Sequence, residues 1–148
     1  MKLTTVLKII RFWPPFLGAG IRVKSFNADL TSIVIQMKMR FWNKNYVGTH
    51  FGGSLYSMTD PFYMLMLMHA LGRDYIVWDK SSRIRYKIPA RGVVYASFSL
   101  TPEIIAQIKA EVQTAKKTEP EFTVQIMDEK GRVVAEVNKV LHVSKKES

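Results

Sequence analysis

The chain has 148 residues, of which 47% are hydrophobic, and it contains no cysteine. This length and composition predict one folded domain, residues 1–148, with a hydrophobic core. The absence of cysteine excludes disulfide bonds, a thiol nucleophile and thiolate metal ligands, and it fits a cytoplasmic location. The three histidines show no metal-binding spacing, so we expect no metal site.

The formal net charge is +10, which predicts attraction to polyanions such as phosphate-bearing small molecules, anionic lipid or nucleic acid. The basic residues are spread along the chain and come without an RNA-binding signature or zinc-finger spacing. We therefore expect a solvated basic surface and no nucleic-acid partner.

The first 13 residues predict a short amphipathic helix. Its apolar residues recur at helical spacing and share one face: Leu3, Val6, Leu7 and Ile10. Lys8 and Arg11 interrupt the apolar run and Pro14-Pro15 ends it, which fits neither a secretory signal nor a membrane-spanning helix. We interpret this helix as packing on its own domain or on a second subunit. Its binding to the surface of an anionic membrane is the alternative.

The middle of the chain predicts two strands followed by a helix. Residues 21–26 and 33–39 have strand character and are joined by a tight connection at residues 27–29. Residues 54–71 are apolar nearly all round and predict one long helix that is buried on most sides, with Gly72 as its C-terminal stop.

Period-two alternation predicts that a sheet surrounds this helix. Further strands are expected at residues 83–88, 94–100, 122–126 and 132–143, the last two joined by a hairpin turn. A second helix starts at Thr101, which can cap it, with Pro102 at its first position. The predicted fold class is α+β: an antiparallel sheet wrapped around a long central hydrophobic helix, with an extra helix before the last two strands.

The loop before the long helix has the composition of an acyl-transfer site. It follows the pattern N-x-x-G-T-x-x-G-G-x(6)-D, made by Asn45, Gly48, Thr49, Gly52, Gly53 and Asp60. This pattern resembles that of the hotdog-fold acyl-CoA thioesterases of the phenylacetate-pathway type. The extra helix and the run from His50 to Leu67 are similar to an uncharacterised branch of that superfamily.

The resemblance covers nearly the whole chain and implies a hotdog-fold enzyme that hydrolyses acyl-CoA or another acyl thioester. Coenzyme A would be part of the substrate, and no separate cofactor is implied. Open sheet edges and the apolar first helix predict at least a homodimer, with a homotetramer as the larger assembly.

Three residues have predicted catalytic roles. A backbone N–H at a helix start can stabilise the negative charge that forms on a thioester carbonyl, and Gly52 is the expected donor. Asp60 is the expected general base or nucleophile. Asn45 is expected to orient the water or the thioester; in the resembling family, this loop faces the acid across a dimer interface.

Substrate binding is assigned to the rest of the loop and to a basic strand. Thr49 and Gly53 belong to the loop. Arg83, Arg85 and Lys87 share one face of a strand by their period of two, where the phosphates of coenzyme A can pair with them.

Each assignment has a structural alternative. Asp60 before Pro61 is typical of a helix cap, Asn45 of an Asx turn, and the glycine pair of close backbone packing. The related thioesterases commonly have histidine directly before the glycine pair, where this chain has Phe51, and His50 lies one residue too early. These departures leave a non-catalytic acyl-CoA or acyl-chain binding protein on the same fold as an alternative function. The amphipathic first helix leaves a second one, a peripheral membrane-associated protein.

Overall fold

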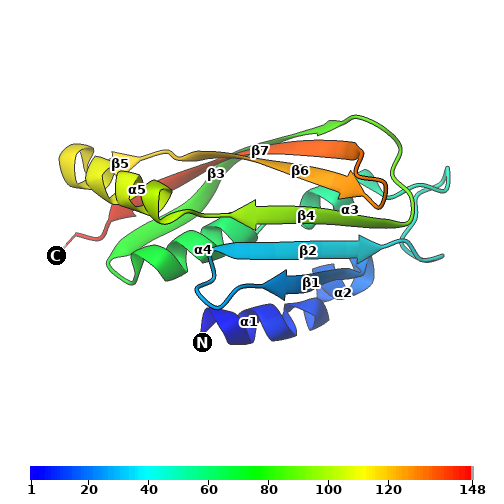
Figure 1. Ribbon diagram of the computed structural model, residues 1–148, viewed down its shortest axis with the longest axis horizontal. Helices are drawn as coiled ribbons and strands as arrows, with labels where there is room; N and C mark the ends of the chain where they lie inside the picture. The colour runs from blue at the N-terminus through cyan, green and yellow to red at the C-terminus, as the bar shows by residue number, and fades with distance from the viewer. Residues whose placement is uncertain (148) are drawn as a thin grey trace.

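Seven strands form one antiparallel sheet in the computed structural model, which describes residues 1–147. The strand order is β1-β2-β4-β6-β7-β3, and the short β5 pairs with β7 (Figure 1). The strands are β1 (Ile21–Phe26), β2 (Ser32–Lys38), β3 (Tyr75–Tyr86), β4 (Val93–Ser99), β5 (Lys117–Thr118), β6 (Glu121–Asp128) and β7 (Val133–Lys145). The predicted α+β class with an antiparallel sheet is confirmed.

Among the described residues, five α-helices and one 3₁₀ helix accompany the sheet: α1 (Leu3–Ile9), η1 (Ile10–Phe12), α2 (Pro14–Ala19), α3 (Gly52–Ser57), α4 (Phe62–Leu71) and α5 (Pro102–Ala115). The extra helix is α5, where the Thr101 hydroxyl accepts a hydrogen bond from the N–H of Ile104 at 3.2 Å. Pro14 opens α2 instead of ending the helical segment, because proline suits the first position of a helix. No helix within residues 1–147 has the length and apolar character needed to cross a membrane.

The long central helix expected over residues 54–71 is two helices, α3 and α4. The N–H of Asp60 bonds three residues back, to the carbonyl of Ser57 at 3.1 Å, so the helical pattern stops there. Pro61 has no N–H to continue it and disfavours helical dihedrals in the residue before it. The break places Asp60 in an exposed turn between two helices.

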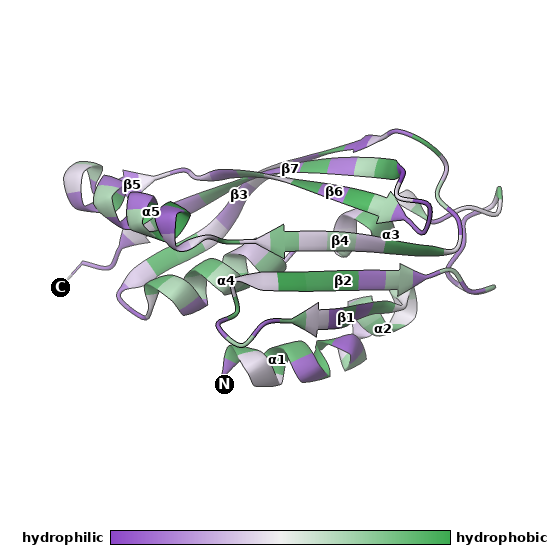
Figure 2. Ribbon diagram, viewed as in Figure 1, coloured by the Kyte–Doolittle hydropathy of each residue, from purple (hydrophilic) through white to green (hydrophobic). Residues whose placement is uncertain are grey.

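The core lies between α4 and the inner face of the sheet. Tyr63 on α4 stacks on Phe122 of β6 with ring centroids 4.1 Å apart, and Phe62 packs on Phe98 of β4 at 5.2 Å. Figure 2 shows apolar residues along α4 and a mixture of apolar and polar residues along the strands. One side of α4 stays open in the single chain, where Met68 is 48% exposed.

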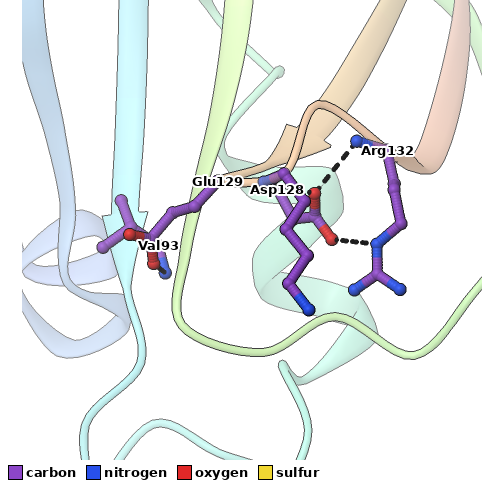
Figure 3. Close-up of polar contacts among 5 residues, drawn as sticks. Val93, Asp128, Glu129 and Arg132 are labelled. Carbon is purple, nitrogen blue, oxygen red and sulfur yellow. Dashed lines mark hydrogen bonds and ion pairs between the residues drawn. The ribbon is translucent and has the colours of Figure 1, made fainter.

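The hairpin between β6 and β7 is closed by Asp128 (Figure 3). Its carboxylate accepts hydrogen bonds from the N–H groups of Lys130 and Arg132 and from Nε of Arg132, at 2.8 to 2.9 Å. Burial alone would raise the pKa of Asp128, but these contacts hold it below its usual value. Glu129 accepts a hydrogen bond from the N–H of Val93 at 3.1 Å, which ties the hairpin to β4.

Candidate functional site

Asn45 holds the loop that precedes α3. Its Oδ1 accepts hydrogen bonds from the N–H groups of Val47 and Thr49, at 3.1 and 2.9 Å. Its Nδ2 donates to the hydroxyl of Thr49 at 2.8 Å and to the carbonyl of His50 at 3.3 Å. An amide side chain offers two donors and has two principal acceptor positions, and all four are occupied here. This arrangement favours the Asx-turn interpretation over an orienting role in catalysis.

His50 is a buried anchor of the same loop. The residue is only 3% exposed, and Nε2 of its ring lies 2.7 Å from the carbonyl oxygen of Gly92. The N–H of His50 also donates to the carbonyl of Ala90 at 2.8 Å. Burial lowers the pKa of His50 below its usual value of 6.5, so the ring is neutral at pH 7. Because a carbonyl oxygen can only accept, Nε2 carries the hydrogen and donates it to Gly92.

The lowered pKa of His50 predicts how stability depends on pH. Between the usual value of 6.5 and the lower folded-state pKa, the unfolded chain binds a proton that the folded chain does not. The free energy of unfolding should therefore fall as pH decreases through this window. In His50→Gln, an amide N–H can replace the bond to Gly92 without titrating. Urea denaturation from pH 7.5 down to about pH 5 should show a flatter pH dependence in this variant; a slope equal to that of the wild type would contradict the assignment.

A pocket of about 400 Å³ opens at the N-terminus of α3, lined by Asn45, Thr49, His50, Phe51, Gly52, Gly53, Leu55 and residues 86–90. The carbonyl of Phe51 accepts the N–H groups of Ser54 and Leu55, at 3.0 and 3.2 Å. Within residues 1–147, no acceptor engages the N–H groups of Gly52 and Gly53, as is usual for the first turn of a helix.

Gly52 lets the side chain of Tyr86 lie close to the start of α3. A Cβ at position 52 would lie 2.9 Å from the hydroxyl of Tyr86, closer than real Cβ contacts come. A Cβ at position 53 would meet the ring of Phe51 at 2.8 Å. The glycine pair thus allows two aromatic side chains to lie against the helix start, and both glycines line the pocket.

Asp60 lies outside this pocket, beyond the far end of α3. It does not cap α4, because Pro61 is the N-cap residue and no side chain accepts a hydrogen bond there. In the part of the chain that the structure describes, the carboxylate of Asp60 takes part in no hydrogen bond or ion pair. The acid is exposed, and within one chain it does not line the pocket that Gly52 lines.

A buried lysine fixes the main chain at Asp60. Lys139, on β7, is 1% exposed, and its Nζ donates to the carbonyl oxygens of Thr59 at 3.2 Å and Asp60 at 2.5 Å. The same Nζ lies 3.2 Å from Oδ1 of Asp79 on β3, an ion pair without hydrogen-bond geometry. Burial raises the pKa of Asp79, and the negative charge of Asp60 adds to this, while Lys139 opposes it.

The basic strand is the exposed edge strand β3. Arg83 and Arg85 lie opposite Asn138 and Glu136 of β7, on the outer face of the sheet. Lys87 follows the end of β3 and is the member of this group that lines the pocket. All three side chains are exposed.

Sequence reasoning missed Tyr86 as a pocket residue and Lys139 as the support of the helix break. For Lys139 a signal was present: it occupies an inward position between Val137 and Leu141 in an otherwise apolar alternation. A lysine at such a position is buried only when it has partners.

The antiparallel sheet packed on α4, with a glycine pair opening α3, is the hotdog fold, and solved structures share it at low sequence identity. The chain belongs to the DUF4442 family, a domain of unknown function, whose model matches residues 4–143. No curated protein sequence matches the chain significantly.

Three solved structures illustrate the likeness. A Pseudomonas aeruginosa protein described as a probable thioesterase is 19% identical, with a TM-score of 0.85 over 99% of this chain and 97% of its own. A protein of unknown function from Chlorobaculum tepidum is 15% identical, with a TM-score of 0.76 over 97% and 95%. A thioesterase from Haemophilus influenzae is 14% identical, with a TM-score of 0.68 over 98% and 92%.

Proposed function

We propose that this protein is a thioesterase that hydrolyses acyl-CoA or a similar acyl thioester to a free acid and a thiol. The observation that carries the proposal is the pocket at the N-terminus of α3, where the N–H of Gly52 has no partner among the described residues. Two solved structures with the same fold, from Pseudomonas aeruginosa and Haemophilus influenzae, are described as thioesterases, which supports this reaction class.

The chemistry follows from the residues. The thioester carbonyl oxygen accepts the N–H of Gly52, which stabilises the negative charge that develops on attack. Asp60 takes a proton from a water molecule whose oxygen bonds to the carbonyl carbon. The carbon–sulfur bond then breaks, and the leaving thiolate takes the proton held by Asp60, so coenzyme A departs as the thiol and the carboxylate is restored. Asn45 contributes by holding the loop, since its amide is fully engaged there.

Two copies of the chain are needed for this site. Asp60 follows Gly52 by eight residues, across a helix of six, and the rise along such a helix separates them by roughly 10 Å. A second copy that pairs through the open edge strand β3 and the exposed side of α4 would bring its Asp60 to the pocket. The homodimer is thus part of the proposal, and Lys87 at the pocket, with Arg83 and Arg85 nearby, would bind the phosphates of coenzyme A.

An acyl-CoA binding protein without turnover is the second candidate. It is favoured by Asp60 lying outside the pocket and by Phe51 next to the glycine pair, 57% exposed. Tight binding of acyl-CoA with no release of free thiol would establish it.

A panel of acyl-CoA esters of increasing chain length, assayed by release of free thiol, tests the proposal. We expect turnover of at least one ester by the wild type and its loss in Asp60→Asn. Turnover that is unchanged in the variant would refute the mechanism, and absence of turnover with measurable binding would favour the second candidate.

A further inference from the structure

A recess of about 170 Å³ between α2, β1 and β2 is lined by four basic side chains. We call Arg11, Arg22, Lys38 and Arg40 the basic recess. Arg22 lies opposite Gln36 in the β1–β2 pair, and Lys38 is two residues beyond Gln36, so both project from the same face. Arg11 comes from η1 and Arg40 from the loop after β2.

The positive charge of the basic recess is not neutralised. Within residues 1–147, none of its four side chains forms an ion pair. Residues 1–59 contain eight lysines and arginines and a single acidic residue, Asp29. Asp29 lies in the turn at the other end of β1 and β2, where its carboxylate accepts a hydrogen bond from the hydroxyl of Thr31 at 2.7 Å. On the neighbouring hairpin, Glu129 accepts the N–H of Val93 (Figure 3).

The recess is held in place by a buried asparagine. Asn43 is 8% exposed, and its Oδ1 accepts the N–H of Arg40 at 2.6 Å. Its Nδ2 donates to the carbonyls of Ala19 at 2.9 Å and Lys38 at 3.0 Å. Gly20 has φ +78°, and a Cβ there would lie 3.1 Å from Nδ2 of Asn43. The loop after β2 is therefore fastened to the end of α2, which fixes the main chain that carries Lys38 and Arg40.

Large apolar side chains surround the recess and are open to solvent. Leu17 and Trp42, which also line it, are 57% and 56% exposed, and Trp13 and Phe41 are 51% and 83% exposed. The guanidinium of Arg40 lies 5.9 Å from the ring of Trp42. Exposed tryptophan and aliphatic side chains beside cations are typical of surfaces that lie in the interfacial layer of a membrane.

We propose that the basic recess binds the phosphate group of an anionic phospholipid, with the surrounding apolar side chains inserted among the lipid headgroups. Four cations without ion-pair partners among the described residues surround a small recess and attract a phosphate group, whose oxygens accept charge-assisted hydrogen bonds from them. A soluble phosphate would explain the cations but would leave the exposed apolar side chains without a role. A lipid surface accounts for both, and the proposal is independent of thioester hydrolysis.

Co-sedimentation with vesicles of phosphatidylcholine, with and without phosphatidic acid, tests this proposal. The wild type should sediment only with vesicles that contain phosphatidic acid. Arg22→Gln with Lys38→Gln should weaken this binding roughly 30-fold, because each basic residue near an anionic surface contributes about fivefold. Leu17→Ser with Trp42→Ser should weaken it at least about tenfold through lost apolar contact. Lys109→Gln with Lys145→Gln, a matched loss of charge elsewhere, should bind like the wild type.

Four outcomes would overturn the proposal. In the first, the wild type does not bind vesicles that contain phosphatidic acid. In the second, the Arg22→Gln, Lys38→Gln variant binds as strongly as the wild type. In the third, the Lys109→Gln, Lys145→Gln control is weakened equally, which would mean that net charge alone causes the binding. The fourth is unchanged binding by Leu17→Ser with Trp42→Ser together with competition by inorganic phosphate, which would assign the recess to a soluble anion. Circular dichroism checks that each variant is folded.

Discussion

Asp60→Asn is expected to lower kcat/KM for thioester hydrolysis about 10²–10⁴-fold, the usual effect of losing a general base. The fold should be unaffected, because the carboxylate has no partner within residues 1–147 and the main chain at Asp60 is held by Lys139. Asparagine is nearly the same size as aspartate, and no cap is lost because Asp60 does not cap α4. Equal melting temperatures with a large loss of turnover would thus identify a chemical role for the acid.

Gly52→Pro removes the proposed oxyanion donor without removing any hydrogen bond of the fold. Position 52 is the first of α3, where proline is accepted, and Phe51 before it is already extended, with φ −63° and ψ 127°. We expect a loss of kcat of roughly 10²–10³-fold. Gly52→Ala keeps the N–H and adds the same crowding of Tyr86. A loss in the alanine variant as large as in the proline variant would assign the effect to pocket shape instead.

Mixing the two inactive variants tests the two-copy site. A mixed dimer of Asp60→Asn and Gly52→Pro has one pocket with both defects and one with neither, if the acid and the N–H come from different copies. Activity should therefore return when subunits exchange, which mass spectrometry of the mixture can verify. Mixed dimers without activity would show that both groups act within one chain.

The sequence pattern predicts the sheet well where one face is buried. The alternation in β2, β4, β6 and β7 matches their burial, because these strands pack one face on the core. β3 begins at Tyr75, earlier than predicted. Its first four residues do not alternate between apolar and polar, so the period-two pattern does not reveal this part of the strand. A bulge between Asp79 and Ser81 then shifts the phase, so that Asp79 and Ser82 face the same side.

The sequence indicates less of the candidate site than of the fold. Spacing alone indicates Gly52 and Asp60, but it cannot show that all four hydrogen-bonding positions of Asn45 are used by neighbours in its own loop. Residues 54–71 are apolar nearly all round, so their periodicity alone gives no sign of the break between α3 and α4. The steric effect of Pro61 on the preceding residue decides the break, and hence where the acid lies.

Lys139→Met is expected to lower the free energy of unfolding by about 3–5 kcal/mol, the usual result of removing one partner of a buried ion pair. Asp79 would lose its cation, and the carbonyl oxygens of Thr59 and Asp60 would lose their donor. Urea denaturation followed by circular dichroism measures the change. Lys80→Met is the control: Lys80 lies on β3, next to Asp79, and its ion pair with Glu119 is at the surface, where such pairs contribute about 0–1 kcal/mol.

The double variant Lys139→Met with Asp79→Leu separates the charge effect from the carbonyl contacts. If the isolated carboxylate causes most of the loss, the double variant should recover most of it, because apolar residues often replace a buried pair at little cost. The two carbonyl oxygens would still lack a donor, so a deficit of about 1–3 kcal/mol should remain. A Lys139→Met variant as stable as the Lys80→Met control would instead mean that the helix break at Asp60 holds its position without the lysine. In that case Lys139→Met should also keep its thioester hydrolysis. If Lys139→Met instead displaces Asp60, kcat should fall more than KM changes.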